Sequence, residues 1–436
     1  MKRSQFGAAI LLSTVLAACG GGGSKDEATA DTYLQFYNGA ASAGNTRLKA
    51  GDTTIGSASY GGVTSVVALT TDSYTLAFTD ADSSNEILSE QKQLSQNDKM
   101  LLILTEQDQQ FDYLSLSFKR DAELEEKFNL YLTNLSTQYP NLDVYLAAEN
   151  KPFADAALEE TLSLHEVSTQ AKSHATGKYN LYLTRAGEMT PIFTAENVNF
   201  AYENTYVMVV RDKHGPLAAQ LSVDVVLNSS AVSAYSNKDA AAQFRVYNSL
   251  TERVHLAVDN QLIGTINAGE MSSYIETAKG DYSLSVRNGG GNLLLNSALL
   301  SVESGDSKQV LLYNTADEVT EALAVTEQET PQLKANDVMV ANLATDFDAL
   351  SIYFVRQNET ISNAKYTVKN LAFKRQQSIN LPQDYYAIAL VHVAENGSTT
   401  LLDKTDNLRL EPGRYYSLFA EKDMAAPSGY KLKLVH

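Results

Sequence analysis

The residues best suited to chemistry are two short acidic clusters. The first places four oxygen-bearing side chains at alternate positions, Asp80, Asp82, Ser84 and Glu86. This spacing is typical of the first half of a calcium-binding loop, but the required glycine is missing and Gln91 stands where such a loop needs a glutamate. The second cluster, "TDFDAL", offers Asp346 and Asp348. Calcium is therefore a candidate ligand at both clusters, and an ordinary solvated loop is the preferred interpretation.

The histidines are the other candidate metal ligands. There are six, His165, His174, His214, His255, His392 and His436. None forms the His-x-x-x-His pattern of a helical zinc site. His165 and His174 have Glu159, Glu160 and Glu166 near them in the sequence, but zinc needs three or four converging ligands. We interpret the histidines as solvated loop residues and predict no cofactor.

The common catalytic motifs are missing from the sequence. It contains neither a Gly-x-Ser-x-Gly nucleophile elbow nor a Gly-x-x-x-x-Gly-Lys phosphate loop. The glycine-rich "NGGGNLL" from Asn288 lies between two expected strands, which favours a hairpin turn. The sequence therefore predicts a protein that is not an enzyme.

The N-terminus has the composition of a secretory signal peptide, residues 1–18. Lys2 and Arg3 provide a basic start, and Phe6 to Leu16 form an apolar stretch that is too short to span a bilayer. Small residues then lead to Cys19. These features predict export of the chain.

The "LAAC" that ends at Cys19 resembles the lipobox of bacterial lipoproteins. The resemblance implies cleavage between Ala18 and Cys19, and acyl chains such as palmitate on the new N-terminal cysteine. Cys19 is the single cysteine of the chain, so it has no disulfide partner, and lipidation would explain its presence. Several acyl chains hold a protein firmly to a membrane. Gly20 in place of Asp, by resemblance to the enterobacterial sorting pattern, implies the outer membrane, with the chain facing the periplasm or the cell surface.

Charge and composition limit the partners. The formal net charge is −18, which disfavours nucleic acid and anionic lipid. The glycine-rich residues 19–31 should form a flexible tether. We therefore expect contact with the membrane through the lipid alone, and an envelope or surface protein as a possible partner.

The remaining chain contains a repeated strand pattern. "IGSASYGGVTSVV" from Ile55 returns as "IGTINAGEMSSYI" from Ile263, with Gly61 and Gly269 at the same offset. We expect these glycines at turns that need positive φ or close approach, with Thr64 and Ser272 beginning the next strand.

Four copies of a longer unit can be counted from its opening strand. The openings "LQFYN", "LYLTN", "FRVYN" and "VMVAN" each end in asparagine, and short alternating strands with polar turns follow each one. This pattern is typical of β-sandwiches of roughly 100 residues. The predicted domains are 32–123, 124–240, 241–335 and 336–436. Helix formers in Phe153 to Val167 suggest an insertion in the second copy.

The third copy shows the clearest family resemblance. It contains "FRVYN", "VHLAVDNQ", "GEMSSY" and "GDYSLSV" in order, while the second and fourth copies contribute "LDVYL" and "LSIYF". These motifs resemble the DUF4397 family of tandem β-sandwich repeats, whose members are commonly lipoproteins or secreted surface proteins. The resemblance implies four tandem immunoglobulin-like or transthyretin-like antiparallel β-sandwiches. The family's Ser-Pro-Asp turn is replaced here by "SLTER", so a loop function would not transfer.

Together these features predict a membrane-anchored, non-enzymatic cell-envelope lipoprotein that acts as a structural spacer or interaction module. The alternative is a surface adhesin or a protein that binds peptide or carbohydrate. Its 24 tyrosines could form such a surface, but most occupy alternating strand positions and the chain has no tryptophan.

Overall fold

The structure is a computed structural model that describes residues 32–436 apart from 82, 109, 121–122, 328–334 and 412–413. The predictions for the signal peptide, for cleavage at Ala18 and for lipidation of Cys19 lie outside the described residues, as does Asp82. Within the described part, none of the helices is long and apolar enough to cross a membrane.

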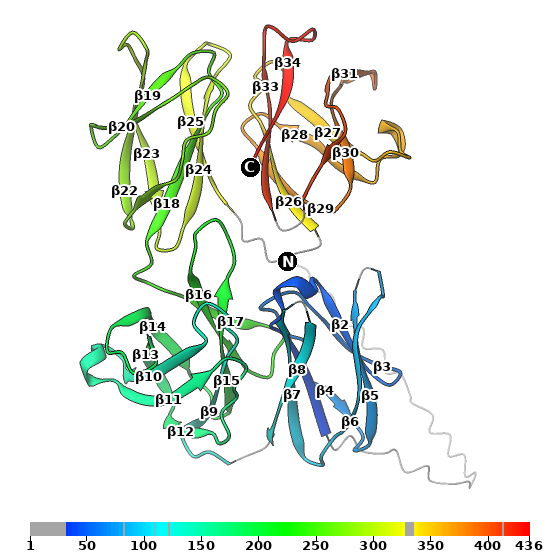
Figure 1. The fold of residues 1–436 in the computed structure, drawn as a ribbon, viewed down its shortest axis with the longest axis vertical. Helices are drawn as coiled ribbons and strands as arrows, with labels where there is room; N and C mark the ends of the chain where they lie inside the picture. Colours follow the sequence, from blue (N-terminus) through cyan, green and yellow to red (C-terminus); the bar gives the residue numbers. More distant parts are fainter. Residues whose placement is uncertain (1–31, 82, 109, 121–122, 328–334, 412–413) are drawn as a thin grey trace, which may run out of the picture.

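The fold is all-β, as predicted: eight sheets pair into four sandwiches, which we call domains 1 to 4 (Figure 1). Domain 1 contains β1 (Thr32–Asn38), η1 (Ala41–Ala43), β2 (Thr46–Ala50), β3 (Thr53–Ala58), β4 (Val67–Leu69), β5 (Ser73–Asp80), β6 (Glu86–Gln93), β7 (Asp98–Gln107) and β8 (Gln110–Lys119). Domain 2 contains β9 (Lys127–Asn134), β10 (Asn141–Ala148), η2 (Phe153–Asp155), β11 (Ala157–Ser163), β12 (Lys172–Ala175), β13 (Gly177–Arg185), β14 (Pro191–Phe200), β15 (Thr205–Lys213), β16 (Gln220–Val226) and β17 (Val232–Ser236).

The second half of the chain repeats this arrangement. Domain 3 contains β18 (Ala242–Asn248), β19 (Val254–Val258), β20 (Gln261–Ile266), β21 (Ile275–Thr277), β22 (Gly280–Asn288), β23 (Leu293–Val302), β24 (Ser307–Asn314) and β25 (Thr320–Thr326). Domain 4 contains β26 (Ala335–Asn342), β27 (Ala349–Val355), η3 (Ile361–Asn363), β28 (Tyr366–Ala372), β29 (Gln376–Pro382), β30 (Tyr385–Val393), β31 (Thr399–Lys404), β32 (Leu408–Arg409), β33 (Tyr415–Lys422) and β34 (Tyr430–Val435).

All four sandwiches share one topology. In domain 1 the sheets have the orders β4-β1-β7-β8 and β3-β2-β5-β6, and the other domains repeat these orders with a few added strands. The sheets are not wholly antiparallel, because β1 runs parallel to β7, as β9 does to β15, β18 to β24 and β26 to β33. Parallel neighbours need a crossover connection. The strands of the opposite sheet provide it here.

The asparagine that ends each opening strand builds the corner to the next strand. Asn38, Asn134, Asn248 and Asn342 are all fully buried. Each side-chain Oδ1 accepts a hydrogen bond from the backbone N–H two residues later, and each Nδ2 donates to a carbonyl across the corner. This is the Asx turn that asparagine forms readily. The repeated asparagine is therefore structural.

The repeated glycines occupy turns, as predicted, since Gly61 and Gly269 have φ of 72° and 70°. The prediction that Thr64 and Ser272 begin a strand is wrong, because β4 and β21 start three residues later. Instead their hydroxyl oxygens accept hydrogen bonds from backbone N–H groups of β1 and β18, at 3.0 and 2.9 Å. The hydroxyl replaces a carbonyl where the chain leaves the sheet.

The helical tendency of residues 153–167 is overridden. Only η2 is helical there, and Ala157–Ser163 forms strand β11 along the edge of β10. Pairing with β10 and burial of Leu162 in the domain 2 core outweigh the helix propensity.

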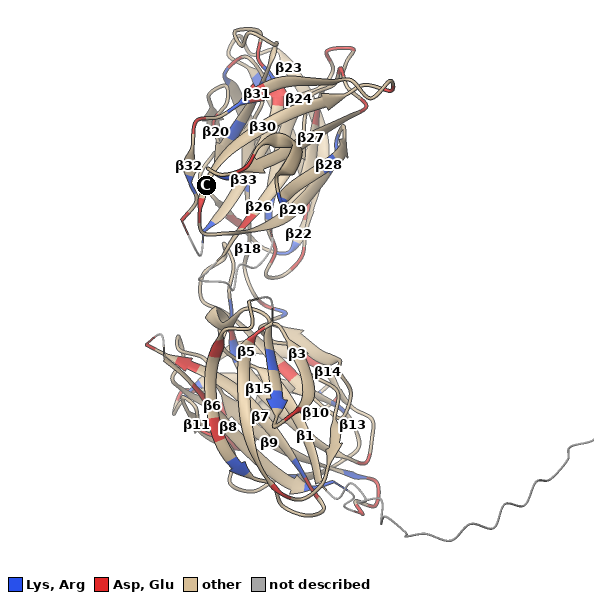
Figure 2. Ribbon diagram, turned by 90° about the vertical axis from the view of Figure 1, so that its right-hand side faces the viewer, with Lys and Arg blue, Asp and Glu red and all other residues tan. Residues whose placement is uncertain are grey.

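The four sandwiches pack as two pairs. Domains 1 and 2 join through one sheet of each, with an apolar layer of Tyr37, Val63, Leu101, Ile103, Leu116, Phe118, Leu135, Val207, Val209 and Val226. Domains 3 and 4 join through Tyr247, Leu311, Tyr313, Val325, Met339, Ala341, Leu343 and Phe419. We call these pairs the N-terminal body and the C-terminal body. Figure 2 shows a narrow connection between them.

Candidate functional site

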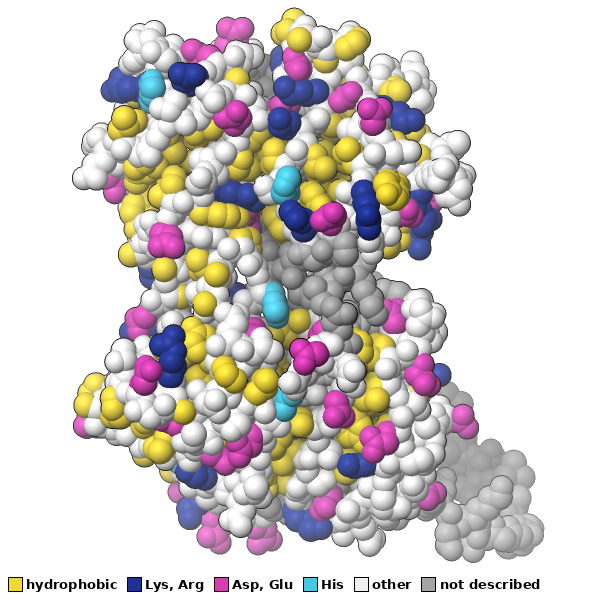
Figure 3. Space-filling model, viewed as in Figure 1, with side chains coloured by type: hydrophobic (Ala, Val, Ile, Leu, Met, Phe, Trp, Pro, Cys, Tyr) yellow, Lys and Arg dark blue, Asp and Glu magenta, His cyan; other side chains and the backbone are white. Residues whose placement is uncertain are grey.

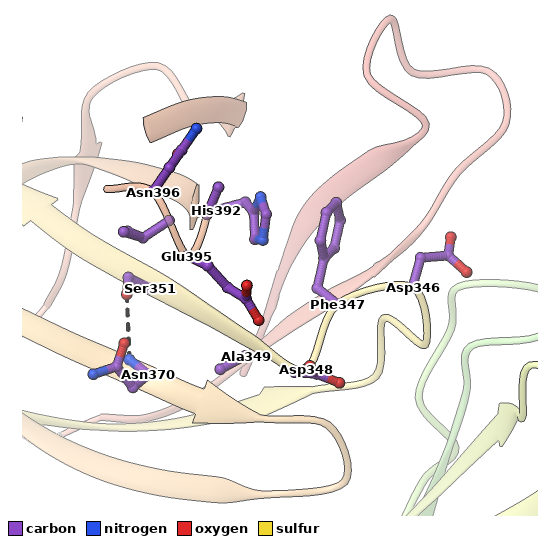
Figure 4. A pocket seen from close by; sticks show the side chains of 11 residues that line it. Asp346, Phe347, Asp348, Ala349, Ser351, Asn370, His392, Glu395 and Asn396 are labelled. Atoms are coloured by element: carbon purple, nitrogen blue, oxygen red, sulfur yellow. Dashed lines mark hydrogen bonds between the residues drawn. The ribbon is translucent and has the colours of Figure 1, made fainter. Parts of the chain in front are cut away.

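A hollow with polar side chains around it lies at one end of domain 4. A hollow of about 720 Å³ is lined by Asp346, Phe347, Asp348, Ala349, Ser351, Asn370, His392, Val393, Ala394, Glu395 and Asn396 (Figure 4). Its volume falls in the range of small-ligand sites, roughly 300–1,000 Å³.

Two loops position these side chains. The corner after β26, which Asn342 fixes, carries Phe347 and Asp348 to the rim. The β30–β31 hairpin supplies His392 and Glu395 from the other side. Figure 4 shows the Phe347 and His392 rings facing each other and the Glu395 carboxylate directed toward Asp348. The ring centroids of Phe347 and His392 are 4.4 Å apart.

The carboxylates of the hollow differ in their partners. Asp346 contacts the Lys422 ammonium at 2.6 Å and accepts a hydrogen bond from the Tyr430 hydroxyl. Burial acts to raise the pKa of Asp346, but these two bonds lower it below its usual value. Asp348 and Glu395 are exposed and have no ion-pair partner among the described residues. The hollow therefore presents two uncompensated negative charges beside an aromatic ring.

The structure does not bring the calcium candidates together as a ligand set. Both oxygens of Asp346 are used by Lys422 and Tyr430, and Asp80 accepts two hydrogen bonds from Ser83. In the part of the chain that the structure covers, no three His, Cys, Asp or Glu side chains converge as metal ligands. Asp82 is outside that part.

The histidines are scattered, and each has a local contact. His174 lies 3.1 Å from the buried Glu159 carboxylate, which also contacts Lys172 at 3.9 Å. Burial lowers the pKa of His165, which has φ of 60° in a loop. The remaining contacts are His214 with Tyr60, His255 with Thr265, His392 with Phe347 and His436 with Tyr416.

Buried charges at the domain interfaces form a second cluster that the sequence did not reveal. Across the first interface the Tyr37 hydroxyl donates to Asp224 at 2.6 Å, and Arg211 Nε donates to the same carboxylate at 2.7 Å. Burial, followed by the Asp224 charge, raises the pKa of Tyr37 well above its usual value. In the second interface the Tyr247 hydroxyl donates to Glu421 at 2.9 Å.

These buried groups have the residue types of an active site but not its access. Tyr37 and Asp224 have no exposed surface. Substrate cannot reach them while the domains are packed. We interpret the cluster as buried hydrogen bonds that fix the orientation of one sandwich relative to the other.

Charged side chains of both signs are spread over one face of the molecule. On the face shown in Figure 3, the described acidic and basic side chains are scattered over both bodies, and none of the basic side chains gather into a continuous patch.

Comparison with known families identifies the repeats. The profile of DUF4397, a domain of unknown function, matches residues 32–145 and 242–353, together just over half of the chain. The chain belongs to the DUF4397 family. Each DUF4397 match begins at the first strand of a body and runs past one sandwich into the second strand of the next, β10 or β27. The two DUF4397 matches therefore follow the division into two bodies.

Three solved structures match this chain remotely. The TIE protein of Bacillus anthracis matches with a TM-score of 0.16 and 9% identity, over 86% of this chain and 66% of that one, so the chain spans just under two thirds of its length. A putative cell adhesion protein from Bacteroides fragilis matches with a TM-score of 0.15 and 10% identity, over 43% and 84%. The major pilin subunit of Bacillus cereus matches with a TM-score of 0.14 and 9% identity, over 68% and 98%. No curated protein matches the sequence.

Sequence reasoning singled out Asp346, Asp348 and His392 of the hollow separately, as metal candidates. It missed Phe347 and Glu395, which complete the site. The signal was present in the sequence, because residues 134–146 and 342–354 align without a gap.

Proposed function

We propose that this DUF4397 protein is a lipid-anchored, non-enzymatic component of the bacterial cell envelope, in which two rigid bodies act as a spacer and present loops to a partner. The observation that carries the proposal is the packing of four sandwiches into two bodies. A spacer needs units that do not flex internally, and a buried interface between sandwiches supplies that stiffness.

Both interfaces combine an apolar layer with a buried hydrogen bond. The Tyr37–Asp224 and Tyr247–Glu421 bonds each join two domains. A buried polar group that loses its partner costs about 1–3 kcal/mol, so sliding of one sandwich over the other is disfavoured. Relative motion is thereby confined to the connection between the two bodies.

The membrane anchor is supported by the sequence. Cys19 follows a signal peptide and "LAA", and the glycine-rich residues to Asp31 would separate the lipid from β1. An outer-membrane location, facing the periplasm or the cell surface, agrees with Gly20 after the cysteine.

A non-enzymatic role is supported by the two polar clusters. The buried interface charges are closed to substrate. The domain 4 hollow contains Ser351 and His392 beside its carboxylates, but the Ser351 hydroxyl accepts a hydrogen bond from the Asn370 backbone N–H at 3.2 Å rather than contacting the imidazole as an activated nucleophile would. The hollow instead favours a second candidate role, ligand binding by loops at one end of a sandwich.

The anchor is tested by Cys19→Ser, with Ser24→Ala in the tether as the matched control. Cells grown with radiolabelled palmitate should label the wild type and Ser24→Ala, and both should sediment with membranes. Cys19→Ser should carry no label and remain uncleaved or soluble. Palmitate label on Cys19→Ser would refute the anchor. Separately, protease treatment of intact cells that express the wild type would distinguish surface exposure from periplasmic exposure.

A further inference from the structure

The corner that forms the domain 4 hollow has a close internal relative in domain 2. "NLSTQYPNLDVYL" from Asn134 and "NLATDFDALSIYF" from Asn342 align without a gap. Tyr139 of domain 2 then corresponds to Phe347 of domain 4. Both segments begin at the buried asparagine that builds the corner, so the aromatic ring leaves the same place in the two sandwiches.

In domain 2 this corner holds an arginine side chain. The guanidinium carbon of Arg185 lies 5.5 Å from the centroid of the Tyr139 ring. Its Nη1 lies 3.8 Å from the carboxylate of Glu188. The guanidinium is thus bound between an aromatic face and a carboxylate, which is a favourable setting for arginine.

The corner of domain 4 has the aromatic ring and the glutamate that surround Arg185 in domain 2, but it has no arginine at the corresponding position. Leu142 pairs with Arg185 on β13, and extension of the Ser351–Val391 register by one residue pairs the corresponding Leu350 with His392. A glutamate follows three residues later in both hairpins, Glu188 in one and Glu395 in the other. A shorter histidine therefore replaces the arginine, while the aromatic ring and the carboxylate remain.

The corner of domain 4 is also more negatively charged than the corner of domain 2. Asp348 in domain 4 stands where domain 2 has Pro140, which adds a carboxylate to the hollow. Asp348 and Glu395 have no basic partner in the described part of the chain, whereas Glu188 has Arg185. The hollow is complementary in charge to a cation that comes from outside the chain.

We propose that the domain 4 hollow binds an arginine side chain of a partner protein, between the Phe347 ring and the carboxylates of Asp348 and Glu395. The guanidinium would take the place that Arg185 takes in domain 2, stacked on the ring and bonded to carboxylate oxygen. This inference goes beyond the spacer role and does not depend on the lipid anchor.

Methyl NMR of the full mature chain, carrying Cys19→Ser for solubility, tests the proposal. The probe is N-acetyl-arginine amide, whose one charge is the guanidinium, and the control is N-acetyl-citrulline amide, which has the same shape without the charge. The methyl groups of Val393 and Ala394, which line the hollow, should shift with the arginine compound. The citrulline compound should bind at least about fivefold more weakly.

Two exchanges between the corners sharpen the test. His392→Arg supplies an internal guanidinium, so it should weaken probe binding about tenfold or more. Arg185→His removes the internal cation of domain 2, so the Ala186 methyl group, unresponsive in the wild type, should respond to the probe. Circular dichroism of each variant should match that of the wild type.

The combined change Asp348→Asn and Glu395→Gln removes the charge while keeping the shape, and it should abolish the difference between arginine and citrulline compounds. Equal shifts from the two compounds in the wild type, unchanged binding in His392→Arg, or no response of Arg185→His would each overturn the proposal.

Discussion

Replacement of Lys99 should change how the stability of the protein depends on pH. Lys99 lies on β7 with 1% of its surface exposed, at the interface between domains 1 and 2. Its ammonium donates to Asn228 Oδ1 at 2.8 Å and to the Leu227 carbonyl at 3.3 Å, both from domain 2. Burial, with a smaller contribution from the Arg120 charge, lowers the pKa of Lys99 to about 7.

The sign of the effect follows from the two pKa values. An unfolded lysine has a pKa of about 10.4, so the unfolded chain binds a proton that the folded chain releases near pH 7. The free energy of unfolding is therefore highest above the unfolded pKa and falls as pH decreases toward the folded pKa of about 7. Below that value the loss is complete. A difference of about 3.4 pKa units corresponds to roughly 5 kcal/mol.

Urea unfolding of the wild type and of Lys99→Met between pH 6 and 9.5 measures this effect. The free energy of unfolding of the wild type should rise by up to about 1.4 kcal/mol per pH unit above pH 7, relative to the variant. The loss of two hydrogen bonds shifts the variant by about 1–3 kcal/mol at every pH, so the slope is diagnostic. Lys49→Met, which removes an exposed lysine, is the control and should keep the wild-type slope. Parallel curves for the wild type and Lys99→Met would refute the reasoning.

Three further predictions concern the corners, the turns and calcium. Asn248→Ala should lower the free energy of unfolding by about 2–4 kcal/mol in urea, because its buried side chain makes three hydrogen bonds, two of them fully buried; a loss below 1 kcal/mol would contradict its role. Gly269→Ala should lower the free energy of unfolding in urea by about 1 kcal/mol, because alanine is strained at positive φ. Gly61→Ala should lower it by about 1–3 kcal/mol more, because the new Cβ would lie 2.7 Å from Arg211 Nη2. Equal losses of stability in the two variants would show that the contact with Arg211 has no effect. Addition of calcium or of a chelator should leave the melting temperature unchanged in calorimetry, and a rise with calcium would restore the metal site.

Strand positions could be predicted because they depend on local pattern. The opening strand "FRVYN" alternates and ends in an asparagine, and the structure places it as β18 with its turn where the glycine repeat indicated. The role of Asn248 could not be derived, since its amide donates to the carbonyl of Ile266, the last residue of β20 in the opposite sheet. Residues 157–163 were misjudged for the same reason, because pairing with β10 decides their conformation.

The grouping into two bodies was missed although the sequence carries a sign of it. "MLLILT" from Met100 is a continuous apolar run rather than an alternating one. Such runs indicate a strand covered on both faces. Leu102 packs into the domain 1 core, while Leu101 and Ile103 pack against domain 2. A single sandwich explains only one of these faces.

The polar contacts within and across the interfaces were beyond sequence reasoning. Tyr37 and Asp224 meet although 187 residues separate them, and each alone is an ordinary strand residue. The hollow is an intermediate case. The gapless alignment of residues 134–146 with 342–354 identifies the corner in the sequence. The contact of Arg185 with Tyr139, which only the structure shows, is needed to infer what kind of ligand the corner of domain 4 binds.

Hydrogen exchange in Asp224→Ala tests most directly whether domains 1 and 2 form one body. Loss of this carboxylate leaves Arg211 buried without its partner, which costs about 3–5 kcal/mol. If the two domains unfold together, the slowest amides of β5, in the domain 1 sheet that faces away from domain 2, should exchange about 10²-fold faster or more, in step with those of β15. Unchanged exchange in β5 beside faster exchange in β15 would show that the sandwiches are independent and contradict the account.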